Sequence, residues 1–300
     1  MGAEDILTDL GLTGAAWAAP IGSGPGVGFN EHRSVTPASV MKVQIALTVE
    51  DLIAAGRLDG ASPRRLPAAA RTPGPVGISL MRDDVIMSVR DLVVAMLTVS
   101  DNVATDELLA LVGLDEVNRR TGNLGLAHTR IISDLGTMLD QLAGEVGFDD
   151  YAGLAAHDPA ADGPPSREEL VAGIAASAAL DPGRGSRTTA SDVVRLLRAI
   201  WTDVAGRPSA CRRVREVMAN QLTRARLASG FPASVGISAK SGGLLGVVRN
   251  EVGVVGLPDG RAYAVAVFTR REPPNTTDPA VIDSAIGRVA RALVDELSGD

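Results

Sequence analysis

A serine and a lysine three residues apart are the first candidates for chemistry in this sequence. Ser39 and Lys42 belong to a Ser-Val-Met-Lys tetrapeptide that follows Pro37, a residue suited to the first turn of a helix. Residues three apart lie on one face of a helix, so the hydroxyl and the amine can approach each other. A desolvated, neutral lysine can then act as the base that makes the serine a nucleophile. About one Ser-x-x-Lys pattern is expected by chance in a chain of this size, so a capping serine beside a solvated lysine is the alternative.

A second polar cluster, Ser100-Asp101-Asn102, lies between two segments with helical periodicity. Alone, such a tripeptide is most often a turn that caps the next helix. In a functional interpretation, the Ser100 hydroxyl relays a proton to a leaving nitrogen. The Asn102 amide then orients both a substrate amide and the lysine.

A third pattern, Lys-Ser-Gly-Gly over residues 240–243, stands at the end of a predicted strand. Taken alone, it is explained by a strand that runs into a glycine turn. In a site, the charge of Lys240 would lower the pKa of Lys42 and attract an anion. Gly243 would let a substrate approach the backbone closely, and its N–H would form an oxyanion hole with that of Ser39.

In this order along the chain, the three patterns are far more specific together than any one of them. They resemble the motif set of the class A β-lactamases and the related penicillin-binding DD-peptidases, with Ser241 in place of the usual threonine. Residues 88–92 and the pair Thr188-Thr189 look like further segments of that family. The resemblance therefore covers nearly the whole chain.

The resemblance implies a fold, a reaction and a set of site residues. The fold is an antiparallel sheet flanked by helices, beside an all-α lobe. The reaction is acyl transfer through a serine acyl-enzyme, with a small-molecule β-lactam, peptide or ester as substrate and without a cofactor. The catalytic residues are Ser39, Lys42, Ser100, Asn102 and Lys240. The substrate-binding residues are Ser241, Gly242, Gly243 and Arg249, which stands where the family has a carboxylate-binding arginine.

One departure from the family pattern concerns hydrolysis of the acyl-enzyme. Class A β-lactamases carry a Glu-x-x-Leu-Asn motif whose glutamate activates the hydrolytic water, and residues 129–188 contain no such motif. Acidic residues in this stretch are candidates for a substitute base, although most are expected to be merely solvated. They are Asp134, Asp140, Glu145, Asp149 and Asp150. Deacylation is therefore predicted to be slower than acylation.

Periodicity and turn signals predict the elements that position these residues. The helices are expected over residues 1–10, 38–55, 88–97, 102–112, 114–121, 193–201 and 280–297, with Gly56 as a stop signal. The strands are expected in a hairpin over residues 13–31 and over 235–240, 251–256 and 263–270. Loops are expected over residues 63–77 and 149–165.

This order of elements predicts an α/β (α+β) fold. We expect an antiparallel sheet of about five strands, built from both chain ends and flanked by helices, with an inserted all-α lobe. The expected domains are a sheet lobe of residues 1–60 and 186–300 and a helical lobe of residues 61–185. The site would lie between the two lobes of one catalytic unit.

Composition argues against several other classes of protein. A net charge of −7 disfavours a nucleic-acid partner, and no apolar run approaches the roughly 20 residues that span a bilayer. The single cysteine, Cys211, excludes an internal disulfide, and three isolated histidines lack the spacing of a metal site. We expect a monomer without a metal, nucleic-acid or membrane partner. Without a recognisable leader segment, the chain as given is expected to be cytoplasmic, or exported if a leader has been removed.

Three functions stay open at this point. The leading hypothesis is a serine hydrolase that opens β-lactams. The second is a DD-peptidase or esterase of the same fold, in a biosynthetic role. The third is a β-lactam-binding receptor domain that is acylated without turnover.

Overall fold

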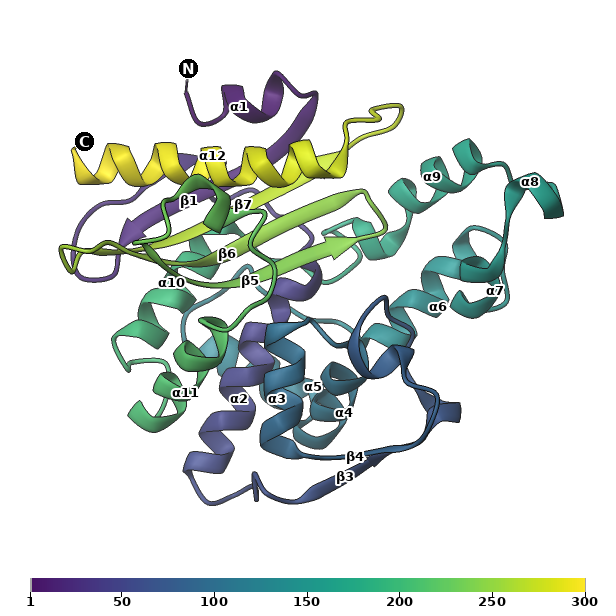
Figure 1. Ribbon diagram of the computed structural model, residues 1–300, viewed down its shortest axis with the longest axis horizontal. Helices are drawn as coiled ribbons and strands as arrows, with labels where there is room; N and C mark the ends of the chain where they lie inside the picture. The colour runs from purple at the N-terminus through teal and green to yellow at the C-terminus, as the bar shows by residue number, and fades with distance from the viewer. Residues whose placement is uncertain (1, 300) are drawn as a thin grey trace.

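A five-stranded antiparallel sheet forms the centre of the protein in the computed structural model, which describes residues 2–299 (Figure 1). The strand order β2-β1-β7-β6-β5 joins strands from the start of the chain to strands from its end. Their bounds are β1 Leu12–Pro20, β2 Val27–Phe29, β5 Gly236–Leu244, β6 Val248–Gly256 and β7 Ala262–Arg271. The predicted sheet of about five antiparallel strands from both chain ends is confirmed.

Successive strand residues point to opposite sides of the sheet, so small apolar side chains lie on both of its faces. Helices cover both faces. On β1, Ala16 belongs to the core shared with α12 (Pro279–Ser298), which lies along one face (Figure 1). Its neighbour Ala15 belongs to the core on the other face, shared with α10 (Ala190–Trp201) and α2 (Lys42–Ala54). Small side chains at such positions allow close helix packing, in keeping with an aromatic content of only 3%.

The middle of the chain is mainly helical and lies beside the sheet (Figure 1). Its helices are α3 Val89–Thr98, α4 Asn102–Val112, α5 Leu114–Asn123, α6 Leu135–Glu145, α7 Tyr151–Ala156, α8 Pro159–Asp162 and α9 Arg167–Ala176. Outside this segment lie α1 Asp5–Thr8 and α11 Pro208–Met218. Short 3₁₀ turns are η1 Ala38–Met41, η2 Ala68–Ala70, η3 Gly77–Leu80, η4 Ala178–Leu180 and η5 Leu227–Gly230.

Local signals explain where several elements begin and end. The stop predicted at Gly56 is observed, since α2 ends at Ala54 and Gly56 has a φ of +68°. The Thr189 side chain caps α10 by accepting a hydrogen bond of 3.0 Å from the Asp192 N–H. The C-terminal strands are longer than predicted, because glycines and polar residues at their ends still pair with neighbouring strands.

Two predicted loops are wrong in part. Residues 63–66 form β3 (Pro63–Leu66), which pairs with β4 (Val85–Ser88) in a separate two-stranded sheet. Residues 149–165 contain α7 and α8, whose first turns are capped by Asp150 and Asp158. Capping aspartates and alanines outweigh the prolines and glycines of that segment. No helix within residues 2–299 is both long and apolar enough to span a bilayer.

Candidate active site

Ser39 lies on the 3₁₀ turn η1, which leads directly into α2. In a 3₁₀ turn the side chains at i and i+3 lie on one side, which places Ser39 and Lys42 on the same face of this turn. The preceding residue, Ala38, has a φ of +48°, which few residues other than glycine adopt and which keeps this first turn from being α-helical as predicted. Gly242 of β5 packs against the turn, since a Cβ there would lie 2.9 Å from the Pro37 carbonyl oxygen and 3.4 Å from the Ser39 nitrogen.

Lys42 is fully buried at the start of α2 and is held by the Ser100–Asn102 segment. Its Nζ donates hydrogen bonds to the Ser100 carbonyl oxygen at 2.7 Å, to Ser100 Oγ at 3.2 Å and to Asn102 Oδ1 at 2.9 Å. Burial lowers the pKa of Lys42 from 10.5 to about 7, against the negative charges of Asp101 and Asp106, which raise it. A substantial fraction of Lys42 is therefore neutral near pH 7 and has a lone pair available.

The turn between α3 and α4 fixes these partners of Lys42. Ser100 has a φ of +66°, an uncommon conformation that turns its carbonyl and hydroxyl toward the lysine. Asp101 caps α4 by accepting from the Ala104 N–H at 2.9 Å. The Asn102 amide nitrogen donates to the Pro73 carbonyl at 2.9 Å, which orients its oxygen toward Lys42.

The segment 240–243 lies on β5, the edge strand of the sheet. Lys240 is fully buried, and its Nζ donates to the Ser241 carbonyl at 2.8 Å. Burial and the neighbouring Lys42 hold the pKa of Lys240 well below its usual range, although Glu251 opposes the shift. The Ser241 N–H points off the open edge and donates to the Gln221 side chain. Gly243, two residues on, presents its N–H on the same side, next to the cavity at Ser39.

The cavity beside Ser39 is small, about 60 Å³, and its wall from α6 is apolar. Leu135, Met138 and Leu139 of α6 line it, together with Asn102. No aspartate or glutamate of residues 2–299 lines this cavity. The cavity therefore places Ser39 beside Asn102, which contacts the buried amine of Lys42, without a carboxylate in its lining.

The acidic residues considered as substitute bases have other roles or positions. Asp134 caps α6 by accepting from the Thr137 N–H at 2.7 Å and lines a separate hollow. Asp140 accepts from the Tyr151 N–H, Glu145 from the Ala178 N–H and Asp150 from the Gly153 N–H, while Asp149 is exposed.

Asp106 is a site residue that the sequence did not reveal. Its carboxylate accepts from the N–H groups of Leu135 and Gly136, each at 2.9 Å, and from the Thr72 hydroxyl at 2.7 Å. Burial raises the pKa of Asp106 despite these hydrogen bonds. It holds the start of α6, and with it Leu135, against the cavity. The available signal was its position one helical turn after Asn102, on the same face of α4.

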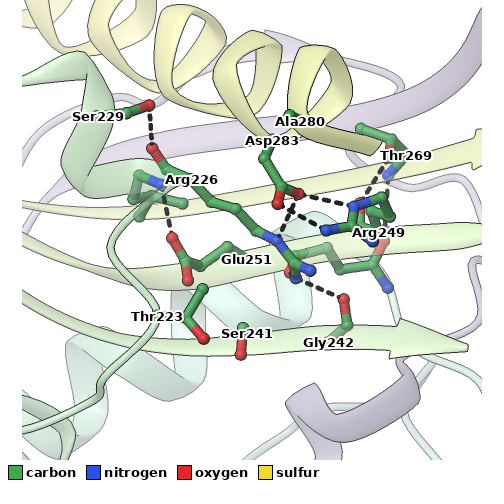
Figure 2. Close-up of polar contacts among 12 residues, drawn as sticks. Thr223, Arg226, Ser229, Ser241, Gly242, Arg249, Glu251, Thr269, Ala280 and Asp283 are labelled. Atoms are coloured by element: carbon green, nitrogen blue, oxygen red, sulfur yellow. Dashed lines mark hydrogen bonds and ion pairs between the residues drawn. The ribbon is translucent and has the colours of Figure 1, made fainter. Parts of the chain in front are cut away.

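Arg249 pairs with Asp283 of α12, a partner not predicted from the sequence. Its Nε and Nη2 donate to the two oxygens of Asp283 at 2.7 and 2.6 Å (Figure 2). The buried Arg226 donates to Asp283 at 2.8 Å and to the Gly242 carbonyl at 2.7 Å (Figure 2). It also donates to the Asn250 carbonyl at 2.7 Å. Binding of a substrate carboxylate by Arg249 stays a prediction, and the carboxylate would have to share the guanidinium with Asp283.

Sequence comparison finds one family and one informative relative. A model of the β-lactamase enzyme family matches residues 4–297. The β-lactamase regulatory protein BlaB of Streptomyces cacaoi is 31% identical over 308 residues, which cover 98% of this chain and 96% of that protein.

Structural comparison finds the same fold. A β-lactamase from Sphaerobacter thermophilus superposes with a TM-score of 0.76 at 22% identity, over 99% of this chain and 95% of that one. The protein PBP-A superposes with a TM-score of 0.75 at 18% identity, over 99% of this chain and 96% of that one. The family model and BlaB, which span nearly the whole chain, confirm the resemblance inferred from the motifs. This chain belongs to the β-lactamase enzyme family.

Proposed function

We propose that this protein is acylated on Ser39 by β-lactams and releases the acyl group slowly, so that it acts as a β-lactam-binding protein more than as a fast hydrolase. The observation that carries the proposal is the composition of the site. The buried Lys42, whose pKa is lowered to about 7, lies three residues after Ser39, while the cavity beside Ser39 is lined by no carboxylate of residues 2–299.

Acylation uses groups already positioned around Ser39. Neutral Lys42 accepts the Ser39 proton as Oγ bonds to the lactam carbonyl carbon, and the N–H groups of Ser39 and Gly243 stabilise the oxyanion. When the C–N bond breaks, the proton passes from Lys42 through Ser100 Oγ to the leaving nitrogen. The hydrogen bond of 3.2 Å between Lys42 and Ser100 supports this route.

Deacylation requires a water molecule activated beside the acyl carbonyl. The α6 wall of the cavity, with Leu135, Met138 and Leu139, offers that water no base. Lys42 can return a proton to Ser39, but its three hydrogen bonds hold it against Ser100 and Asn102 and away from a second water. The acyl-enzyme is therefore expected to accumulate.

The relatives support different versions of this chemistry. The name of BlaB, a β-lactamase regulatory protein, favours a role in which the acylated or ligand-bound state is a signal. The family model keeps hydrolysis as the second candidate, with true turnover of a β-lactam.

Stopped-flow kinetics with a chromogenic cephalosporin, combined with intact-protein mass spectrometry, test the proposal. We expect a burst of one equivalent, slow turnover and an adduct that Ser39→Ala abolishes. Linear turnover without a burst or adduct would favour the hydrolase. A folded protein that forms no adduct with any β-lactam would refute acylation and leave a ligand-binding or peptidase role.

A further inference from the structure

A second cavity lies behind the Ser39 turn, on the face of the sheet that carries α10. Its volume is about 230 Å³, and it is bounded by the start of β1, the ends of β6 and β7 that meet there, and the loops 33–36 and 180–182. Val248, Phe268 and Leu180 give it an apolar floor. Only Thr36 lines both this cavity and the one beside Ser39, so the two are distinct.

Backbone donors without partners border this cavity. Val35 pairs in both directions with Thr188, at 2.9 and 3.0 Å, so the N–H groups of Ser34 and Thr36 point the opposite way. Neither of these two N–H groups makes a hydrogen bond with any residue of the described chain. Thr36 is only 7% exposed, and a buried N–H without a partner is rare in folded proteins. The Thr36 N–H points in the same direction as the Thr36 carbonyl, which accepts a hydrogen bond from Asn250 of the cavity wall. The N–H therefore faces the cavity.

The charges around the cavity leave one cation available. Glu272 pairs with Arg270, which also donates to two backbone carbonyls, and Asp181 accepts from the Gly183 N–H and from Arg184. The exposed guanidinium of Arg33 makes no hydrogen bond or ion pair within residues 2–299. The acidic groups are thus neutralised by their own partners, whereas Arg33 is free to bind an anion.

We propose that this cavity binds a small organic carboxylate with a short apolar body. The carboxylate accepts from Arg33 and from the N–H of Thr36, and the apolar body packs on Phe268 and Val248. A charged acceptor suits an unpartnered backbone N–H and a guanidinium, and the apolar floor favours an organic acid over a bare inorganic anion. The inference does not depend on acylation of Ser39.

A titration of the protein with 4-fluorobenzoate, followed by ¹⁹F NMR, tests the site, and 4-fluorobenzamide serves as the uncharged control. We expect saturable binding of the acid at about millimolar concentration, as suits so small a ligand, and much weaker binding of the amide. Arg33→Gln should weaken binding about tenfold or more, since it removes a charged donor. Ser34→Trp should block the cavity from its exposed rim, and the matched surface change Arg57→Gln should leave binding unchanged.

Three results would overturn the proposal. One is the absence of saturable binding up to about 20 mM, well above the affinity expected for such a ligand. Another is equal binding of the acid and the amide. The third is unchanged binding in both Arg33→Gln and Ser34→Trp, which would place the acid elsewhere, for example near Lys240. Both altered side chains are exposed, and thermal unfolding confirms that each variant is folded before titration.

Discussion

The rate of Ser39 acylation should follow the neutral fraction of Lys42. Burial places the pKa of Lys42 at about 7, whereas an ordinary lysine has a value of 10.5. At pH 7 about half of the buried amine is neutral, against about 0.03% for an ordinary lysine, so burial raises the concentration of base about 10³-fold. Below pH 7 the acylation rate should fall about tenfold per pH unit, and above pH 7 it should level off.

The assay is the burst rate with a chromogenic cephalosporin between pH 5 and 9, with Lys42→Ala as the control. The control should acylate slower by several orders of magnitude and without this profile. A wild-type acylation rate that still increases above pH 9 would mean that Lys42 is charged at neutral pH. Wild-type rates in Lys42→Ala would mean that another base acts. Either result would refute the reasoning.

The same pKa shift makes an independent prediction for stability. Between pH 7 and 10.5 the unfolded chain binds the Lys42 proton that the folded chain lacks, so stability rises with pH in this window. Relative to Lys42→Met, wild-type stability should rise by about 1.4 kcal/mol per pH unit, or about 5 kcal/mol across the window. Below pH 7 both states are protonated and the difference should be constant. Urea unfolding of both proteins at pH 6, 7, 8 and 9 measures the slope, and parallel curves would contradict the shift.

Three further predictions concern residues around Ser39. Leu135→Glu should shorten the lifetime of the acyl-enzyme about tenfold or more by supplying a base, whereas Leu135→Gln, of the same shape, should not. Mass spectrometry of quenched samples follows the adduct, and an equal shortening by both variants would exclude base catalysis. Gly242→Ala should slow acylation about 100-fold by displacing the Ser39 turn, while Gly144→Ala, in open space on α6, should leave the rate unchanged. Stopped-flow measurements compare the two acylation rates, and similar rates would contradict a role for Gly242 in positioning Ser39. Arg249→Ala should raise KM about tenfold for carboxylated substrates and leave KM for neutral esters unchanged, because a guanidinium–carboxylate interaction is lost. An equal rise in KM for both substrate types would assign Arg249 to the Asp283 ion pair alone.

The sequence predicted elements whose signals are local. The long helices and the three C-terminal strands depend on periodicity and neighbouring residues, and they are observed. Helical spacing related Ser39 to Lys42, and the family resemblance related this pair to the 240–243 segment, which periodicity alone could not do. Residues 149–165 were mispredicted because prolines and glycines drew attention away from capping aspartates.

Contacts between residues far apart in the chain could not be predicted from the sequence. Asp283 meets Arg249 only because α12 crosses the face of the sheet beside β6, and Arg226 reaches the same carboxylate from the loop before η5 (Figure 2). Asp106 meets Leu135 because α6 begins against α4. Such contacts depend on how elements pack, and a single sequence carries no signal for the pairing.

The neutral lysine and the missing carboxylate are physically linked. Desolvation lowers the pKa of Lys42, and the negative charges of Asp101 and Asp106 already oppose that shift. A carboxylate introduced into the cavity would raise the pKa of Lys42, because an opposite charge favours the protonated amine. A base that speeds deacylation therefore weakens the base that drives acylation at a given pH. In Leu135→Glu, the acyl group should be released faster. The pH at which the acylation rate reaches half its maximum should at the same time shift to a higher value. Under the proposed function, an apolar α6 wall would keep Lys42 ready for acylation, and slow release of the product is the expected consequence.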